Sequence, residues 1–138
     1  MKFFAKFDLA SAYNQLSLDE SSREITTINT PIGLLRWTRL PYGVKTASAQ
    51  FQAAMEATLG NTMTNRIIYQ DDIAIGAKSE KELEIKVRLV LKTLNDVGMM
   101  INPNKCVFRT ESLSFLGHVI SDGKVSPDHS LVKKILSV

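Results

Sequence analysis

Residues 66–76 read Arg-Ile-Ile-Tyr-Gln-Asp-Asp-Ile-Ala-Ile-Gly, two β-rich runs on either side of a short acidic centre. β-branched and aromatic residues favour strands, and two such runs around a polar centre are typical of a β-hairpin. Neighbouring side chains on a straight strand point to opposite faces, so Asp71 and Asp72 share a site only on a tight turn. The stretch therefore predicts a hairpin that carries two carboxylates at its tip.

The residues before this hairpin predict a strand, a second hairpin and a helix. Pro31 and Gly33 supply a turn between two apolar runs. Phe51, Met55 and Leu59 fall at helical spacing. The expected elements are a buried strand at residues 3–9 that ends near Asp8, a polar helical or turning connection at 19–24, hairpin strands at 25–30 and 34–40, and a helix at 46–59 stopped by Gly60.

The residues after the acidic hairpin predict the clearest helix, over residues 79–97. Ser79 and Glu82 form a capping-box pattern, and Gly98 follows the last apolar position. The expected buried stripe is Leu83, Val87, Val90, Leu91 and Leu94, with the pairs Glu82/Lys86 and Glu84/Arg88 on the solvated side. The last expected elements are short strands at 107–108, 113–116 and 119–120, a tight turn at 122–123, and a new helix over 126–138 that starts at Ser126-Pro127.

This order predicts an α+β fold in which helices back an antiparallel sheet, within one domain that spans residues 1–138. The formal net charge of +3 is compatible with a polyanionic partner but does not require one. Cys106 is the only cysteine, so an internal disulfide is excluded, and we expect a small core residue in a reducing intracellular setting. His118 and His129 are not spaced with other ligands as a metal site. No apolar run approaches the roughly 20 residues of a membrane span, and early charged groups argue against a signal peptide.

Asp8 and the pair Asp71-Asp72 form the candidate chemical centre, because each interrupts an apolar run. Burying a carboxylate is costly unless a cation or hydrogen-bond donors meet it. If Asp8 ends a strand beside the acidic hairpin, three carboxylates converge, and divalent cations relieve their repulsion. Oxygen ligands favour Mg²⁺ or Mn²⁺, and two such ions suit in-line phosphoryl transfer. Two simpler interpretations stay open: solvated turn formers at 71–72, and a strand-end Asp8 bound by backbone amides.

Four motifs, in the family's order, resemble those of reverse transcriptases. Residues 7–13 read Phe-Asp-Leu-Ala-Ser-Ala-Tyr, similar to the first palm motif, an aspartate followed five positions later by an aromatic. Residues 40–52 read Leu-Pro-Tyr-Gly-Val-Lys-Thr-Ala-Ser-Ala-Gln-Phe-Gln, which resembles the second motif, and residues 69–72 resemble the tyrosine-x-Asp-Asp signature. Asn-Pro-Asn-Lys-Cys at 102–106, followed by Phe-Leu-Gly-His-Val-Ile-Ser at 115–121, is similar to the gypsy-like LTR retrotransposon and retroviral type.

The resemblance implies a polymerase palm that performs RNA-directed DNA synthesis, by two-metal transfer of dNTPs onto a primer 3′-hydroxyl. It implies that Asp8 and Asp71 hold two Mg²⁺ or Mn²⁺ ions with help from the Leu9 carbonyl. Asp72 is expected beside them, as the third member of the catalytic and metal-binding set. Tyr13 is expected under the incoming sugar, where it rejects a 2′-hydroxyl. The other residues implied in nucleotide binding are Ser11, Ala12, Tyr42 and Gln70, and those implied in template or primer contact are Gly43, Lys45, Tyr69, Phe115, Leu116 and Gly117.

Three positions depart from the family pattern. Tyr42 stands where retroviral enzymes usually have Gln, Ser48 stands where Pro is usual, and Gln70 is a less common occupant of the variable slot in the signature. The resemblance also implies fingers and a thumb, which these 138 residues largely lack. We therefore expect a fragment truncated at both ends and inactive alone. Its expected context is a longer cytoplasmic polyprotein within retroelement particles, with a primed RNA or DNA template as partner and no membrane.

Two other functions are compatible with the sequence. One is a non-catalytic retroelement remnant that folds and at most binds nucleic acid. The intact Asp8, Asp71 and Asp72 argue against it, whereas the missing fingers and thumb argue for it. The other is an unrelated Mg²⁺-dependent hydrolase that uses the same carboxylates. That interpretation lacks a candidate base near the acidic pair and leaves the motif at residues 40–51 unexplained.

Overall fold

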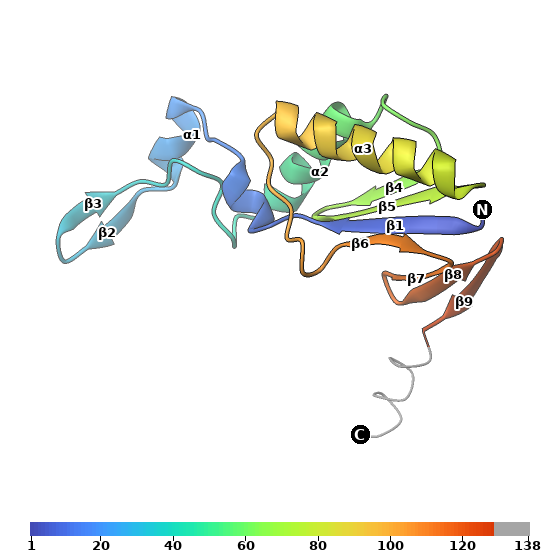
Figure 1. The fold of residues 1–138 in the computed structure, drawn as a ribbon. Coiled ribbons are helices and arrows are strands. Elements are labelled where there is room, and N and C mark those ends of the chain that lie inside the picture. The colour runs from blue at the N-terminus through green and yellow to red at the C-terminus, as the bar shows by residue number, and fades with distance from the viewer. Residues whose placement is uncertain (129–138) are drawn as a thin grey trace, which may run out of the picture.

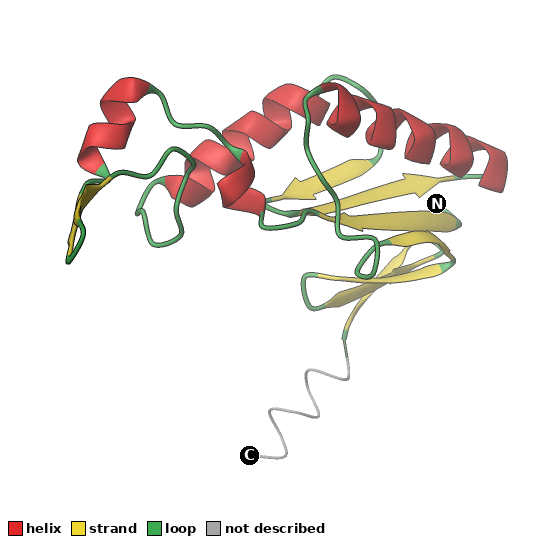
Figure 2. Ribbon diagram, turned by 60° about the vertical axis from the view of Figure 1, so that its left-hand side comes forward, coloured by secondary structure: helices red, strands yellow, loops and turns green. Residues whose placement is uncertain are grey.

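The structure is a computed structural model that describes residues 1–128. Its centre is a four-stranded antiparallel sheet in the order β4-β5-β1-β6 (Figure 1). These strands are β1 (Phe3–Asp8), β4 (Arg66–Tyr69), β5 (Asp72–Ala77) and β6 (Val107–Thr110). Helices α2 (Ala47–Leu59) and α3 (Glu80–Asp96) cover one face of this sheet (Figure 2). The predicted α+β fold, with helices behind an antiparallel sheet, is confirmed.

Strand β1 occupies the middle of the sheet because its side chains alternate between two apolar environments. Ala5 and Phe7 are fully buried on the helix side, whereas Phe4 packs on the opposite side. Phe7 shares the helix-side core with Phe51 of α2 and Leu94 of α3. Burying one such side chain completely stabilises the fold by about 1.5–3 kcal/mol. Both faces of β1 are therefore held, and the C-terminal end of the strand is a rigid position.

Helix α3 begins where the sequence predicts. The hydroxyl of Ser79 accepts the Glu82 N–H at 3.2 Å, while the Glu82 carboxylate accepts the N–H of Lys78 at 2.8 Å instead of closing the box on Ser79. The expectation that Lys86 lies on the solvated side is wrong, because its stem is buried and its Nζ donates to a β5 carbonyl at 2.8 Å. The predicted apolar stripe is confirmed by Leu83, Val87, Val90, Leu91 and Leu94, which all belong to the helix-side core.

An arm built from one helix and one hairpin extends from the end of the central sheet (Figure 1). It follows the short 3-10 helix η1 (Ala12–Gln15) and contains α1 (Glu20–Ile25), β2 (Ile28–Thr30) and β3 (Gly33–Leu35). The predicted hairpin is confirmed, but its strands are shorter than the expected 25–30 and 34–40. Ile25 ends α1 instead of starting β2, because the chain after Asp19 is capped as a helix.

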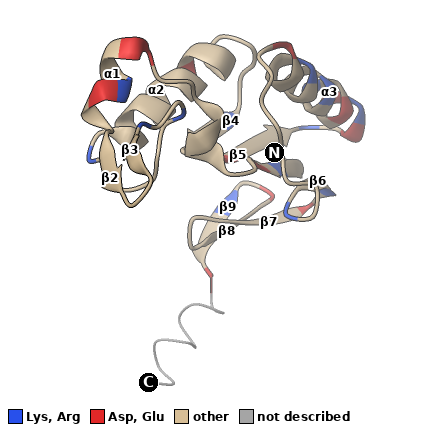
Figure 3. Cartoon of the chain, turned by 90° about the vertical axis from the view of Figure 1, so that its left-hand side faces the viewer, with Lys and Arg blue, Asp and Glu red and all other residues tan. Residues whose placement is uncertain are grey.

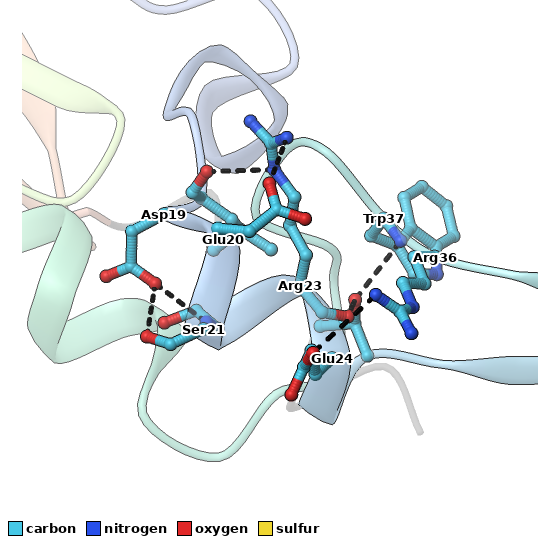
Figure 4. A network of polar contacts seen from close by, with 10 residues as sticks. Asp19, Glu20, Ser21, Arg23, Glu24, Arg36 and Trp37 are labelled. Carbon is cyan, nitrogen blue, oxygen red and sulfur yellow. Dashed lines mark hydrogen bonds and ion pairs between the residues drawn. The ribbon is translucent and has the colours of Figure 1, made fainter.

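Polar contacts cap α1 and join it to the chain that returns from β3 (Figure 4). The carboxylate of Asp19 accepts the Ser22 N–H at 2.7 Å, and this bond is the main reason why the pKa of Asp19 lies below its ordinary value. After β3 the chain returns to α1: Arg36 Nη1 lies 3.8 Å from Glu24 Oε1, and the Trp37 N–H donates to the Thr26 hydroxyl at 3.1 Å. These contacts explain why β3 ends before the position that the apolar pattern predicts.

A second antiparallel sheet lies against the face of the central sheet opposite the helices. Its strands are β7 (Ser112–Phe115), β8 (His118–Ser121) and β9 (Lys124–Pro127). The predicted turn at Asp122-Gly123 is confirmed, with φ of 32° and 76°, the sign that tight primed hairpin turns require. The prediction that Ser126-Pro127 begins a helix is wrong, because this turn sends the chain back along β8 and pairs Ser126 with Val119. The rest of that expected helix, and His129, lie outside the described residues.

Charged side chains are mixed along the helices and are not separated by sign. Figure 3 shows basic and acidic positions interleaved along α3, where Arg88 pairs with Glu84 at 2.9 Å. Within residues 1–128, no helix is long and apolar enough to cross a membrane. The chemically distinctive part of the molecule is the acidic end of the central sheet.

Candidate active site

The acidic residues meet where β1 ends and the β4–β5 hairpin turns. Asp8 and Asp72 are direct partners in the antiparallel β1–β5 ladder, so their side chains leave the sheet on the same face. Such partners have Cβ atoms about 4.5–5.5 Å apart. Asp71 shares the two-residue turn with Gln70, and its carbonyl accepts the Leu9 N–H at 3.0 Å. Asp8 and Asp71, 71 − 8 = 63 positions apart, therefore lie on adjacent backbone segments.

Two lysines approach these aspartates. Nζ of Lys6 lies 2.8 Å from Oδ1 of Asp72, and Nζ of Lys105 lies 3.8 Å from Oδ1 of Asp8. Among residues 1–128, no group of three or more His, Cys, Asp or Glu side chains could hold a metal ion. The three carboxylates therefore do not form one metal-binding group in this part of the chain, and Asp72 is instead engaged by Lys6.

The remaining oxygen donors fit a hard divalent cation. The Asp8 side chain is only 14% exposed. The half-buried Asp71 carboxylate forms no hydrogen bond or ion pair with any side chain or backbone group of residues 1–128. A shielded carboxylate without a partner carries a desolvation cost that a bound cation offsets. Asp8 and Asp71 are thus the side chains that suit Mg²⁺ or Mn²⁺, and Asp72 suits the ion only if it releases Lys6.

The segment at residues 102–106 fixes the backbone of Asp8. The Asn102 N–H donates to the Asp8 carbonyl at 2.8 Å, and Sγ of Cys106 accepts the Asp8 N–H at 3.4 Å. Cys106 packs against the core, as the sequence predicts, and in addition holds the backbone of an aspartate. The sequence signals these contacts only through the motif that contains Cys106, because the partners are 98 positions apart.

Tyr13 stands beside the acidic turn in a wall of aromatic rings. Its ring centroid lies 5.0 Å from that of Tyr42 and 5.4 Å from that of Phe51. Its hydroxyl donates to Oε1 of Gln70 at 3.3 Å, so the ring is tied to the turn that carries Asp71. Three residues predicted to contact the nucleotide, Tyr13, Tyr42 and Gln70, are therefore brought together from three separate segments.

Gln52 of α2 supports this turn, and the sequence does not predict it as a site residue. Its side-chain carbonyl accepts the Gln70 N–H at 2.7 Å, and its amide donates to the Ile68 carbonyl at 3.0 Å. Gln70 has a left-handed φ of 53°, a conformation that costs a non-glycine residue about 1–3 kcal/mol. The bonds from Gln52 offset this strain. The one signal in the sequence is the position of Gln52 directly after Phe51 in the second motif.

The predicted residues on the loop before α2 lie next to the aromatic wall. Gly43, with φ +89°, and Lys45 are both exposed. Tyr42 and Gly43 line a pocket of about 450 Å³ that also reaches Trp37 at the base of the arm. At the other end of the first motif, Ser11 is exposed with a left-handed φ of 49°, and Ala12 is buried.

The predicted primer-contact residues form the turn between β7 and β8. Leu116 and Gly117 both have positive φ, 47° and 79°, and Leu116 is exposed. Phe115 is buried against Phe4, and its ring centroid lies 5.7 Å from Nζ of Lys6. This turn therefore lies on the same face of the central sheet as Asp8 and Asp72. Tyr69, also predicted to contact template or primer, is half-exposed and pairs with Asp72 in the β4–β5 ladder.

A helix-backed antiparallel sheet with carboxylates at a strand end and a hairpin tip defines the class of polymerase palms. Residues 1–120 match the family "Reverse transcriptase (RNA-dependent DNA polymerase)". The chain belongs to the reverse transcriptase family.

Its relatives among curated proteins include retrotransposon polyproteins. The retrovirus-related Pol polyprotein from transposon 412 of Drosophila melanogaster is 36% identical over 128 residues, which is 92% of this chain and 10% of that polyprotein. The transposon Tf2-3 polyprotein of Schizosaccharomyces pombe is 33% identical over 134 residues, 96% of this chain and 10% of that polyprotein. The chain therefore spans about a tenth of the length of these relatives.

Solved structures of foamy viral protease-reverse transcriptase have the same fold. One, in complex with double-stranded DNA, matches all of this chain and 24% of its own with a TM-score of 0.91 at 24% identity. Another, in complex with an RNA/DNA hybrid, matches 99% of this chain and 19% of its own with a TM-score of 0.89 at 24% identity. The central sheet, its two covering helices and the small sheet thus correspond to one part of a larger enzyme.

Proposed function

We propose that these residues form the metal-binding palm of an RNA-directed DNA polymerase that transfers dNTPs onto a primer 3′-hydroxyl. One observation carries the proposal: the register of β1 against the β4–β5 hairpin pairs Asp8 with Asp72 and bonds Leu9 to Asp71, beside the ring of Tyr13. Membership of the reverse transcriptase family supports the same reaction class.

Asp8 and Asp71 are the side chains that we assign to two Mg²⁺ or Mn²⁺ ions, with the Leu9 carbonyl as a further oxygen ligand. Such ions, when bound, activate the attacking hydroxyl and neutralise charge on the phosphates. The contribution of the chain itself is position. Asp8 ends a strand packed on both faces, and the bonds from Asn102 and Cys106 hold its backbone.

Selection of the sugar is assigned to Tyr13. Its ring packs against Tyr42 and Phe51 and is bonded to Gln70, so it does not move aside easily. A ring fixed beside the incoming sugar excludes a 2′-hydroxyl by its volume, which discriminates between dNTPs and rNTPs in the transition state. The backbone amides of Ser11 and Ala12 are assigned to the triphosphate.

Primer and template are the macromolecular partners that we propose. The foamy viral relatives are described in complex with double-stranded DNA and with an RNA/DNA hybrid, which supports a duplex partner here. We assign Gly43, Lys45 and Tyr69 to template or primer contact and the turn at 115–117 to the primer end. Because these relatives are polyproteins, we also propose that the chain works as part of a longer polyprotein. The cytoplasm is the compartment that we propose for it, since its single cysteine suits a reducing setting.

A chimera tests this function. Residues 1–128 replace the corresponding segment of an active reverse transcriptase of the same family, and DNA synthesis on a primed RNA template is measured. We expect synthesis that Asp71→Asn lowers by about 100- to 1000-fold. Asp96→Asn is the matched control, because Asp96 is a carboxylate paired with Lys92 on the surface of α3. A folded chimera without activity, or one in which Asp71→Asn stays active, contradicts the proposal.

A non-catalytic remnant that binds nucleic acid is the second candidate. The ion pair between Lys6 and Asp72 favours it, since this pair neutralises one carboxylate without any metal. The same chimera decides between the two candidates. A remnant gives a folded, nucleic-acid-binding chimera whose synthesis is absent with or without Asp71.

A further inference from the structure

Lys6 lies on β1 two positions before Asp8, on the same face of the central sheet. Its cross-strand partner on β5 is Ala74, which packs with Phe4 and Phe115 in the apolar cluster beneath the small sheet. Lysine is rarely placed in such surroundings unless it is paired. The proposed reaction gives Lys6 no role, so its pairing calls for a separate explanation.

The ammonium of Lys6 is held in one position by two contacts. Its Nζ lies 2.8 Å from Oδ1 of Asp72, and the two side chains are only 23% and 22% exposed. The same Nζ lies 5.7 Å from the ring centroid of Phe115, within the range of a cation–π contact. Partial shielding from water makes this pair stronger than a solvated surface pair.

The three aspartates are therefore not equivalent. Asp72 has a close cationic partner. Among residues 1–128, the only cation that pairs with Asp8 is Lys105, at 3.8 Å on a side chain that is 66% exposed. The Asp71 carboxylate has no hydrogen bond or ion pair among residues 1–128. One carboxylate is neutralised, one is weakly screened and one is open.

We propose that Lys6 is a built-in counter-cation that keeps Asp72 out of the metal coordination shell and so weakens metal binding. This inference rests on the proposed function, because it presupposes that Asp8 and Asp71 bind the ion. The ammonium and the metal compete for the same carboxylate. The three carboxylates together with Lys6 and Lys105 carry a net charge of −3 + 2 = −1, and removal of the Lys6 charge makes this sum −2.

Weak metal binding by the protein alone affects the order in which the metal ion and the nucleotide bind. Mg²⁺ commonly takes one or two carboxylates from the protein and completes its shell with substrate phosphates and water. If Asp72 stays with Lys6, the protein offers the carboxylates of Asp8 and Asp71 only. Complete coordination then depends on the triphosphate, so the ion is retained mainly when a nucleotide is present.

Mn²⁺ binding to the purified chain tests the proposal, with free Mn²⁺ measured by electron paramagnetic resonance. Lys6→Met removes the charge and keeps the length of the side chain. We expect it to tighten Mn²⁺ binding by about tenfold, the order produced by removing one unit charge close to a divalent ion. Lys6→Arg keeps the charge and should bind as the wild type does. Lys81→Met removes an exposed lysine of α3 and is the matched control, also without effect.

A second variant makes the test independent of how well Lys6→Met folds. In the wild-type background, Asp72→Asn leaves the charge of Lys6 uncompensated, so it should weaken Mn²⁺ binding by about tenfold, the reverse of the effect of Lys6→Met. Asp71→Asn should abolish binding. In the Lys6→Met background, Asp72→Asn should cancel the tightening. Thermal melting of each variant confirms the folded state.

The outcomes separate the inference from the function on which it rests. Equal affinities of the wild type and folded Lys6→Met, or equal losses from Asp72→Asn and Asp71→Asn, overturn the role of Lys6 while Asp71-dependent binding leaves the proposed function intact. Binding by Lys6→Met alone supports the role of Lys6 strongly. If neither the wild type nor Lys6→Met binds Mn²⁺ in a way that depends on Asp71, the proposed metal site is overturned, and the inference with it.

Discussion

The side-chain carbonyl of Gln52 accepts the backbone N–H of Gln70 at 2.7 Å and so joins helix α2 to the turn that carries Asp71. β4 is an edge strand, and the outward backbone groups of an edge strand have no strand partner. Gln52 supplies the missing hydrogen-bond partners here: its side-chain carbonyl accepts the Gln70 N–H, and its side-chain amide donates to the Ile68 carbonyl. Because Gln70 also accepts the Tyr13 hydroxyl, one helix side chain links the proposed metal ligands to the proposed sugar gate.

Gln52→Ala should lower the free energy of unfolding by about 1–3 kcal/mol, because it leaves the Gln70 N–H without its partner. Urea unfolding followed by circular dichroism measures the change. Gln50→Ala is the matched control, because Gln50 is an exposed residue of the same helix. Within the described residues, its side chain bonds only to the Thr46 hydroxyl, at 3.4 Å. Its cost should stay within about 0.5 kcal/mol. Equal losses for the two variants would contradict a special role for Gln52.

Tyr13→Val in an active chimera should lower the dNTP-to-rNTP ratio of kcat/KM by roughly tenfold or more, because the ring that excludes a 2′-hydroxyl is gone. Tyr13→Phe keeps the ring and loses only the bond to Gln70, so its ratio should stay close to that of the wild type. Truncating a packed aromatic side chain costs about 3–5 kcal/mol, so thermal melting must show that the variant is folded. A folded Tyr13→Val enzyme with an unchanged dNTP-to-rNTP ratio would show that Tyr13 is an ordinary packing residue and does not select the sugar.

Glu82 should contribute to stability in a pH-dependent way. Its pKa lies below the ordinary value of 4.5, first because Lys86 donates to its carboxylate and second because the Lys78 N–H does. A depressed folded pKa means that the contribution is complete above the unfolded pKa and is lost as the pH falls through the folded value. The gap in Tm between the wild type and Glu82→Gln should therefore be widest near about pH 7 and shrink below about pH 4.5.

Glu84→Gln is the control for this pH series, because the pair of Glu84 with Arg88 is well exposed and exposed pairs contribute little. Near neutral pH, the difference in Tm between the wild type and Glu84→Gln should be smaller than that between the wild type and Glu82→Gln. A gap for Glu82→Gln that stays constant down to about pH 3 would show that its carboxylate charge is not what stabilises α3.

The purified chain alone should not extend a primer at a measurable rate. It matches 24% of the length of one solved relative, and the correct placement of reactants supplies about 7–11 kcal/mol of catalysis in favourable cases. Incorporation of labelled dNTPs onto a primed RNA template measures this, with Asp71→Asn as the blank. Robust incorporation that disappears in the blank would show that these residues position primer, template and nucleotide by themselves.

The parts of the fold that local sequence determines are predicted well. The hairpin at residues 66–76 follows from two β-rich runs around a polar centre, and α3 follows from the cap at Ser79 and a regular apolar stripe. The start of a helix at Ser126 is wrong because Ser-Pro also fits the end of an edge strand. Pairing with β8 determines that these residues form a strand and not a helix, and no local sequence pattern reveals that pairing.

The site is predicted in part for the same reason. Resemblance to a family indicates Asp8, Asp71 and Tyr13, and the structure brings their backbone segments together. The roles of Lys6 and Gln52 depend on which side chains meet after folding. Lys6 of β1 reaches Asp72 on the neighbouring strand β5, and this contact has no signature in the sequence. Gln52 reaches Gln70 from a helix, and the sequence signals it only by the position of Gln52 after Phe51 in the second motif.

Iron-directed cleavage tests most directly whether Asp8 and Asp71 share one metal site. Fe²⁺ takes the place of Mg²⁺, and with ascorbate and hydrogen peroxide it produces hydroxyl radicals that cut the nearest backbone. We predict cuts near residue 8 and near residues 71–72, both suppressed by excess Mg²⁺ and by Asp71→Asn. Cuts at only one of these places, or cuts that persist in Asp71→Asn, would contradict a shared site.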